Sequence, residues 1–254
     1  LGELGELLFE IGERGFATGE VNLRIETVTH PVALETLQLD LDLSPDPRGQ
    51  GFALEVEAAD GVRDNHRLGV DGVVASAQAN INLRALRLGT SHGNWQLDAP
   101  ATLTLDQGTW DLSTLRIVSG ERAVEAQGTL PVSGEIDFSA RATDIDVAFL
   151  SAFVAADAGL AGNLSAQFNA AGTATAPRAT LVAGVDDVII AGEGRGKATL
   201  RADLDDGRLA AEARFEPDAA NWVRAVATIP VSVSYTHLRA HETKANLVCR
   251  LLLE

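Results

Sequence analysis

A glycine-rich run is the part of the sequence that comes nearest to a phosphate-binding loop. The run extends from Gly192 to Thr199, but Ala191 stands where such a loop needs its first glycine. Ala198 follows Lys197, where a Ser or Thr would have to hold a magnesium ion. We therefore expect no nucleotide site here, and we interpret the run as a glycine-rich hairpin turn.

Alternating acidic residues near position 40 resemble part of a calcium loop. Asp40, Asp42, Ser44 and Asp46 supply oxygen atoms, but the central Gly and the terminal Glu of a helix-loop-helix calcium site are absent from this stretch of sequence. Leucines stand between the first aspartates, so we expect these aspartates on the polar face of a strand.

The remaining catalytic candidates are histidines, and they are dispersed. His30, His66 and His92 lie far apart, and none has the neighbouring carboxylate and nucleophile of a catalytic triad. The sequence therefore predicts no catalytic residue, no metal site and no cofactor, and thus a protein that is not an enzyme.

Composition excludes further classes of partner. The chain has 254 residues, with 36 acidic against 20 basic side chains and a net charge of −16. Such a charge argues against binding of nucleic acid and against electrostatic docking on anionic lipid headgroups. An apolar share of 46% is normal for a folded chain. No run approaches the roughly 20 apolar residues that span a bilayer.

The last part of the sequence has a different character. Residues 233–254 read VSYTHLRAHETKANLVCRLLLE, which resembles a translated sequencing adapter followed by a primer. We interpret this tail as an artefact and exclude it from the expected fold. The tail contains Cys249, the single cysteine, so residues 1–232 have no disulfide and no thiolate metal site.

Two-residue alternation dominates residues 1–232 and predicts strands that have one apolar face. In the first clear example, leucines at odd positions alternate with Gln38, Asp40 and Asp42. The residues that we expect on an apolar, ligand-facing side are Leu37, Leu39, Leu41, Leu43, Phe52, Leu54, Val56, Leu103, Leu105, Ile136, Phe138, Leu164 and Phe168.

Short turn signals separate the alternating runs. Asp60-Gly61, Asp71-Gly72, Gln107-Gly108 and Asp206-Gly207 are typical of tight hairpin turns, since such turns need positive φ angles. Consecutive hairpins predict an antiparallel meander. The segment Thr129–Val132 also recurs as Thr228–Val231, 99 positions later, which indicates stacked modules.

Two segments have helical spacing instead. Residues 2–13 place Leu4, Leu7, Leu8 and Ile11 on one stripe, and residues 146–157 do the same with Val147, Leu150 and Val154. The expected fold is therefore all-β: an elongated, twisted antiparallel sheet with one or two short helices.

Three segments carry a family resemblance. Residues 159–180 read GLAGNLSAQFNAAGTATAPRAT, a glycine-bounded strand followed by Gly-Thr, a spacer and Pro-Arg; residues 144–150 read DIDVAFL, and residues 128–132 read GTLPV. This pattern resembles the periplasmic region of the TamB/AsmA-like family. The resemblance covers residues 1–232 and rests on spacing and texture.

The resemblance implies an open β-groove, or half-pipe, with an apolar inner face. Family members reside in the periplasm of Gram-negative bacteria, anchored in the inner membrane, and conduct phospholipid acyl chains toward the outer membrane. TamB is also linked to assembly of outer-membrane proteins with a barrel partner. The chain would then be a fragment, with its anchor and its barrel-binding region outside it. The family has no catalytic motif.

Two alternatives stay open at the level of sequence. The first is a structural or adhesive extracellular protein similar to an autotransporter passenger, which would form a parallel β-helix. The second concerns the apolar faces, because periodicity does not distinguish a lipid-lined groove from half of a sandwich core.

Overall fold

Alternation of apolar and polar residues produces strands along nearly the whole described chain. The structure is a computed structural model that describes residues 7–11, 17–28, 34–59, 66–90, 93–147, 161–190, 193–218 and 220–231. The strands, in chain order, are β1 (Leu7–Ile11), β2 (Ala17–Val28), β3 (Leu34–Asp46), β4 (Gly49–Ala59), β5 (His66–Val74), β6 (Gln78–Thr90), β7 (Gly93–Leu97), β8 (Ala101–Asp106), β9 (Thr109–Ser119), β10 (Arg122–Pro131), β11 (Glu135–Asp146), β12 (Ala161–Thr173), β13 (Ala176–Ile190), β14 (Glu193–Asp205), β15 (Arg208–Glu216) and β16 (Val223–Pro230).

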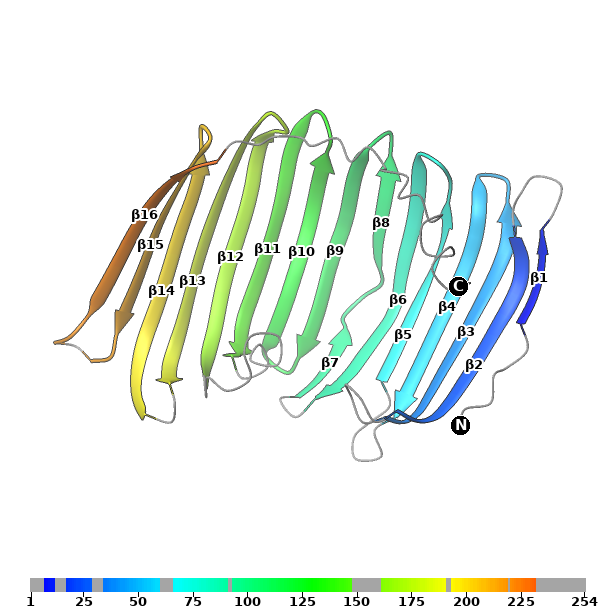
Figure 1. The fold of residues 1–254 in the computed structure, drawn as a ribbon, viewed down its shortest axis with the longest axis horizontal. Coiled ribbons are helices and arrows are strands. Elements are labelled where there is room, and N and C mark those ends of the chain that lie inside the picture. Colours follow the sequence, from blue (N-terminus) through cyan, green and yellow to red (C-terminus); the bar gives the residue numbers. More distant parts are fainter. Residues whose placement is uncertain are drawn as a thin grey trace, which may run out of the picture.

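All sixteen strands belong to one antiparallel sheet. The strands lie side by side in the order of the sequence, from β1 at one end to β16 at the other (Figure 1). Except at the step from β7 to β8, each strand pairs antiparallel with the next strand in the sequence. The prediction of an all-β fold built on an elongated antiparallel sheet is confirmed.

Two short strands share one position in this order. β7 and β8 both lie between β6 and β9: β7 pairs with one end of each neighbour, and β8 pairs with the other end. Pro100 follows β7 and immediately precedes β8. Proline has no N–H group to donate to a ladder, so the position is filled by two strands and not by one.

The helix predicted over residues 2–13 is wrong where the structure describes it. Residues 7–11 form β1, which pairs with β2. The apolar residues Leu7, Phe9 and Ile11 also fit a two-residue period, and a hairpin partner satisfies that pattern in a way that an isolated short helix does not. Of the second predicted helix, Asp146 ends β11, while residues 148–157 lie outside the described part.

Two of the predicted turns are confirmed and one is wrong. Gln107-Gly108 and Asp206-Gly207 have positive φ angles at both positions and join consecutive strands. Asp71-Gly72 instead lies inside β5, where Gly72 faces the ring of Phe52 and the backbone of β6. Glycine is needed there for close approach of two strands, which is its second common role in sheets. Asp60-Gly61 lies outside the described residues.

The sheet forms a single layer with very little buried interior. Only a few apolar residues are buried, among them Ala58, Trp95 and Ile145. No large side chain in the described part is completely buried. A sandwich would bury one face of each sheet, but no second sheet is present among these residues. The described residues also contain no helix with the length and apolarity that crossing a bilayer requires.

Candidate functional site

A row of apolar residues and glycines crosses one face of the sheet from β3 to β16. Directly opposed residues in neighbouring antiparallel strands share a face, so the row can be followed from pair to pair. It contains Leu43, Phe52, Gly72, Ile81, Leu103, Leu112, Gly128, Phe138, Ala170, Ala179, Leu204, Leu209 and Ile229. We call the side of the sheet that carries this row the apolar face.

All thirteen residues that the sequence singled out lie on the apolar face. Leu37, Leu39, Leu41 and Leu43 of β3 face Ala58, Val56, Leu54 and Phe52 of β4, respectively. The pairs farther along the sheet are Ile81 with Leu103, Ala79 with Leu105, Ile136 with Gly172, Phe138 with Ala170, Ala140 with Phe168, and Ile145 with Leu164. Register thus unites residues that are separated by up to 131 positions in the sequence, from Leu37 to Phe168.

The apolar face is uncovered by the described part of the chain. Every one of the thirteen residues is half-buried, and none reaches the burial of a protein core. Leu88, Trp110 and Leu130 on the same face are exposed. An apolar patch that extends over a whole sheet is far larger than the patches of a few hundred Å² that isolated soluble proteins tolerate. The apolar face is therefore a candidate binding surface.

The side chains on this face become smaller toward β16. Leucine, isoleucine, valine and phenylalanine predominate in β3 to β6, whereas alanine is frequent in β12 to β16. In the middle, Phe138 and Phe168 form a tilted aromatic pair with ring centroids 6.3 Å apart. The alternation of alanine with polar residues is a weak signal of an apolar face, which is why no residue beyond Phe168 is predicted to lie on it.

The opposite side of the sheet, which we call the polar face, carries the charged side chains. Arg84 donates a 2.7 Å hydrogen bond to Glu55 and also pairs with Asp71. Arg116 bridges Asp98 and Glu125 at 2.8 Å and 2.6 Å. These pairs join neighbouring strands, and they keep one side of the sheet well hydrated.

Further ion pairs continue along the polar face to the last strand. Lys197 of β14 lies 3.0 Å from Asp186 of β13, and Arg224 of β16 lies 2.7 Å from Glu212 of β15. The hydrogen bond from Arg224 lowers the pKa of the Glu212 carboxyl group below its usual value. Because these groups are exposed, each pair contributes little to stability by itself.

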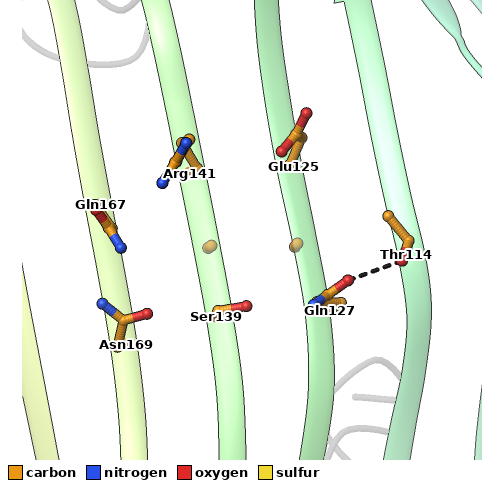
Figure 2. Close-up of a pocket in the computed structure, with 9 residues that line it drawn as sticks. Thr114, Glu125, Gln127, Ser139, Arg141, Gln167 and Asn169 are labelled. Carbon is orange, nitrogen blue, oxygen red and sulfur yellow. Dashed lines mark hydrogen bonds between the residues drawn. The ribbon is translucent and has the colours of Figure 1, made fainter.

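A shallow pocket of about 240 Å³ lies on the polar face. Figure 2 shows the residues that line it. Thr114, Gln127, Ser139 and Asn169 form one polar row across it, and Thr114 donates a 2.8 Å hydrogen bond to Gln127. Amide, hydroxyl and charged groups line this pocket, so it suits water or a hydrophilic ligand. The pocket therefore lies on the side of the sheet opposite the apolar face.

The described residues that resemble a phosphate-binding loop or a calcium loop lie in strands. Lys197 lies inside β14, so the glycine-rich run does not lead into the helix that a phosphate-binding loop requires. Asp40 and Asp42 lie on the polar face of β3, and Asp46 binds Arg48 at the turn. His66 accepts a hydrogen bond from the Gly89 N–H at 3.2 Å. Among the described residues, no cluster of three or more potential ligands is arranged to hold a metal ion.

Comparisons with known protein families, with curated proteins and with solved structures found no match to this chain.

Proposed function

We propose that this chain is a non-catalytic segment of a lipid-conducting envelope protein of the TamB/AsmA-like kind. In this proposal the segment lies in the periplasm of a Gram-negative bacterium and shields phospholipid acyl chains between the inner and outer membranes. The observation that carries the proposal is the unbroken apolar row from Leu43 to Ile229, on a face that no described residue covers.

The dimensions of the face suit acyl chains. The row crosses thirteen strands, and neighbouring strands are about 4.8 Å apart, so it is roughly 58 Å long. Each methylene group that moves from water onto such a face contributes about 0.8 kcal/mol. Leucine, valine, alanine and phenylalanine offer no polar group that would select one headgroup.

The polar face supports the same proposal from the other side. Its acidic and basic groups form cross-strand pairs, which keep that side in water while the apolar face takes up lipid. The net charge of −16 also disfavours adsorption on anionic headgroups, so lipid would be held by its acyl chains. As the second part of the proposal, the protein assists the assembly of outer-membrane proteins. It would bind a barrel partner through other regions.

The adhesive alternative receives less support. A passenger-like protein was expected to form a parallel β-helix, whereas the strands here pair antiparallel in sequence order. Nothing in the described residues favours a binding site for a surface receptor over a face for acyl chains.

Lipid retention tests the proposal. The protein is purified from a bacterial envelope fraction in mild detergent, and bound phospholipid is measured by native mass spectrometry and by extraction. The paired substitution Leu41→Gln with Leu54→Gln places two amides side by side on the apolar face. We expect bound lipid to fall at least severalfold, because each buried amide opposes acyl-chain contact.

A matched control uses the next pair along the same two strands. Asp42 and Ala53 also face each other, but on the polar face. The substitution Asp42→Gln with Ala53→Gln should leave lipid binding unchanged. Equal lipid loss in both variants, or a folded wild-type protein that retains no lipid, would contradict the proposal.

A further inference from the structure

Trp110 marks one edge of the apolar face, in the middle of the sheet. It lies at the start of β9, opposite Leu105 of β8 and Leu130 of β10. Trp110 is 39% exposed and Leu130 is 42% exposed. The indole N–H of Trp110 has no hydrogen-bond partner among the described residues. The accessible ring therefore combines an apolar body on the face with an unused donor at its boundary.

Four apolar-face positions of β10 form a strip that leads away from this edge, which we call the β10 strip. Leu130 begins it, Gly128 and Ala126 form its middle, and Val124 ends it. Leu130 and Val124 are six residues apart in the sequence, which is about 20 Å along a strand. The hydrocarbon core of a bilayer is about 30 Å thick, so one acyl chain needs about 15 Å. One extended acyl chain therefore fits along the β10 strip.

Larger side chains lie on both sides of the middle of the strip. Leu112 of β9 and Phe138 of β11 are both opposite Gly128, and Phe138 packs on Phe168. Gly128 has a φ angle of 126°, which residues with a side chain rarely adopt, and a Cβ atom there would overlap with the backbone of Asp137. Because position 128 accepts only glycine, the strip stays low between two bulky neighbours.

The far end of the β10 strip is more enclosed than the Trp110 edge. Ile145 of β11, near the far end, is 4% exposed, whereas Val132, beside the Trp110 edge, is 64% exposed. Val124 itself is half-open to solvent, so an acyl chain can reach it. A polar headgroup loses free energy when it leaves water without a hydrogen-bond partner. The Trp110 edge offers both solvent and a donor, so it suits the headgroup end of a lipid.

We propose that a phospholipid binds along the β10 strip in one orientation, with its glycerol ester groups at Trp110 and the methyl end of its chain at Val124. This inference rests on the proposed lipid-conducting function and adds the direction in which the lipid lies. In this arrangement the indole N–H donates to an ester or phosphate oxygen, as tryptophan does at membrane interfaces. Leu112 and Phe138 contact the chain from its two sides.

Contact quenching by bromine tests the orientation. A lysophospholipid with bromine near either the carboxyl end or the methyl end of its chain is added below its critical micelle concentration. The Trp95→Phe, Trp222→Phe variant leaves Trp110 as the single tryptophan. We expect bromine near the carboxyl end to quench its fluorescence severalfold more than bromine near the methyl end, because quenching requires contact.

A matched reporter occupies the other end of the strip. Further substitution of Trp110→Phe and Val124→Trp moves the single tryptophan to the exposed position 124, and the preference should reverse. Equal quenching by the two lipids, or the same preference at both positions, would overturn the orientation and leave lipid binding intact. Absence of bound lysophospholipid in native mass spectrometry would overturn the proposed function as well.

The same contact can be measured without removing a tryptophan. Fluorotryptophan is incorporated into the wild-type chain, and the Trp110 resonance is assigned by its loss in Trp110→Phe. A lysophospholipid with a nitroxide near the carboxyl end of its chain should broaden this fluorine resonance severalfold more than one with a nitroxide near the methyl end. Equal broadening would contradict the orientation even if a reporter variant fails to fold.

Discussion

A single glycine shows how closely the strands of this sheet approach. A side chain at position 72 would drive its Cβ atom into the backbone oxygen of Asn80 and place it 3.1 Å from the Phe52 ring. Backbone atoms of a central strand cannot move away without breaking the ladder on both sides. The ring of Phe52 lies over this glycine, so the apolar face stays continuous where no side chain exists.

We expect Gly72→Ala to lower the free energy of unfolding by about 1–3 kcal/mol, because the new methyl group overlaps with backbone. The control is Gly184→Ala in β13, where the nearest atom to the new Cβ is the Ala198 carbonyl oxygen at 3.9 Å. There alanine should raise stability by about 0.5 kcal/mol, since it reduces the freedom of the unfolded chain. Urea unfolding measures both changes, and an equal loss in both variants would contradict the steric explanation.

At the scale of elements, an exposed ion pair joins β15 to β16. Arg224 donates two hydrogen bonds to Glu212, at 2.7 Å and 2.8 Å. Arg224 lowers the pKa of Glu212 by hydrogen bonding and by charge attraction, and Arg214 adds to the attraction. A carboxyl group whose pKa is lowered in the folded state stabilises that state above its unfolded value, which is 4.5 for glutamate.

This contribution should be lost as pH falls below 4.5 through the folded pKa of Glu212. Other carboxyl groups, such as those of Asp46 and Asp203, also have lowered pKa values, so acid affects their contributions to stability too. The comparison of wild type with Glu212→Gln therefore isolates the pair. We expect the difference in urea midpoint between the two proteins to shrink from pH 6 to pH 3. A constant difference would show that the ion pair does not contribute.

Local alternation was sufficient to predict which residues share a face. Leu54 and Phe168 lie on the apolar face because a two-residue period fixes the side of each strand by itself, while their role as ligand-facing residues stays a prediction. The pairing of β7 and β8 with the same two neighbours was not predictable, because it depends on the strand break at Pro100. The helix predicted over 2–13 failed for a related reason: short apolar stretches such as Leu7–Ile11 fit both periods, and the hairpin partner decides.

Over the whole molecule, sequential hairpins build a sheet in which each strand contacts mainly its neighbours. Such an arrangement resembles a repeat protein. The stability of a repeat protein is approximately the sum of the contributions of single repeats and of the contacts between neighbouring repeats. The near absence of buried side chains in the described part agrees with this arrangement. The two faces consequently differ in chemistry: ion pairs line the polar face, and the apolar face is not covered by the described residues.

An uncovered apolar face should bind an apolar fluorescent dye while the protein is fully folded. We expect strong fluorescence of anilinonaphthalene sulfonate with native protein and loss of that signal on unfolding in urea, the reverse of a protein with a closed core. Added short-chain phospholipid should displace the dye and raise the melting temperature, since a ligand that binds only the folded state stabilises it. The Leu41→Gln, Leu54→Gln variant should bind less dye than the Asp42→Gln, Ala53→Gln control. Absence of dye binding to the native protein would mean that the apolar face is covered, either by a second copy or by residues outside the described part.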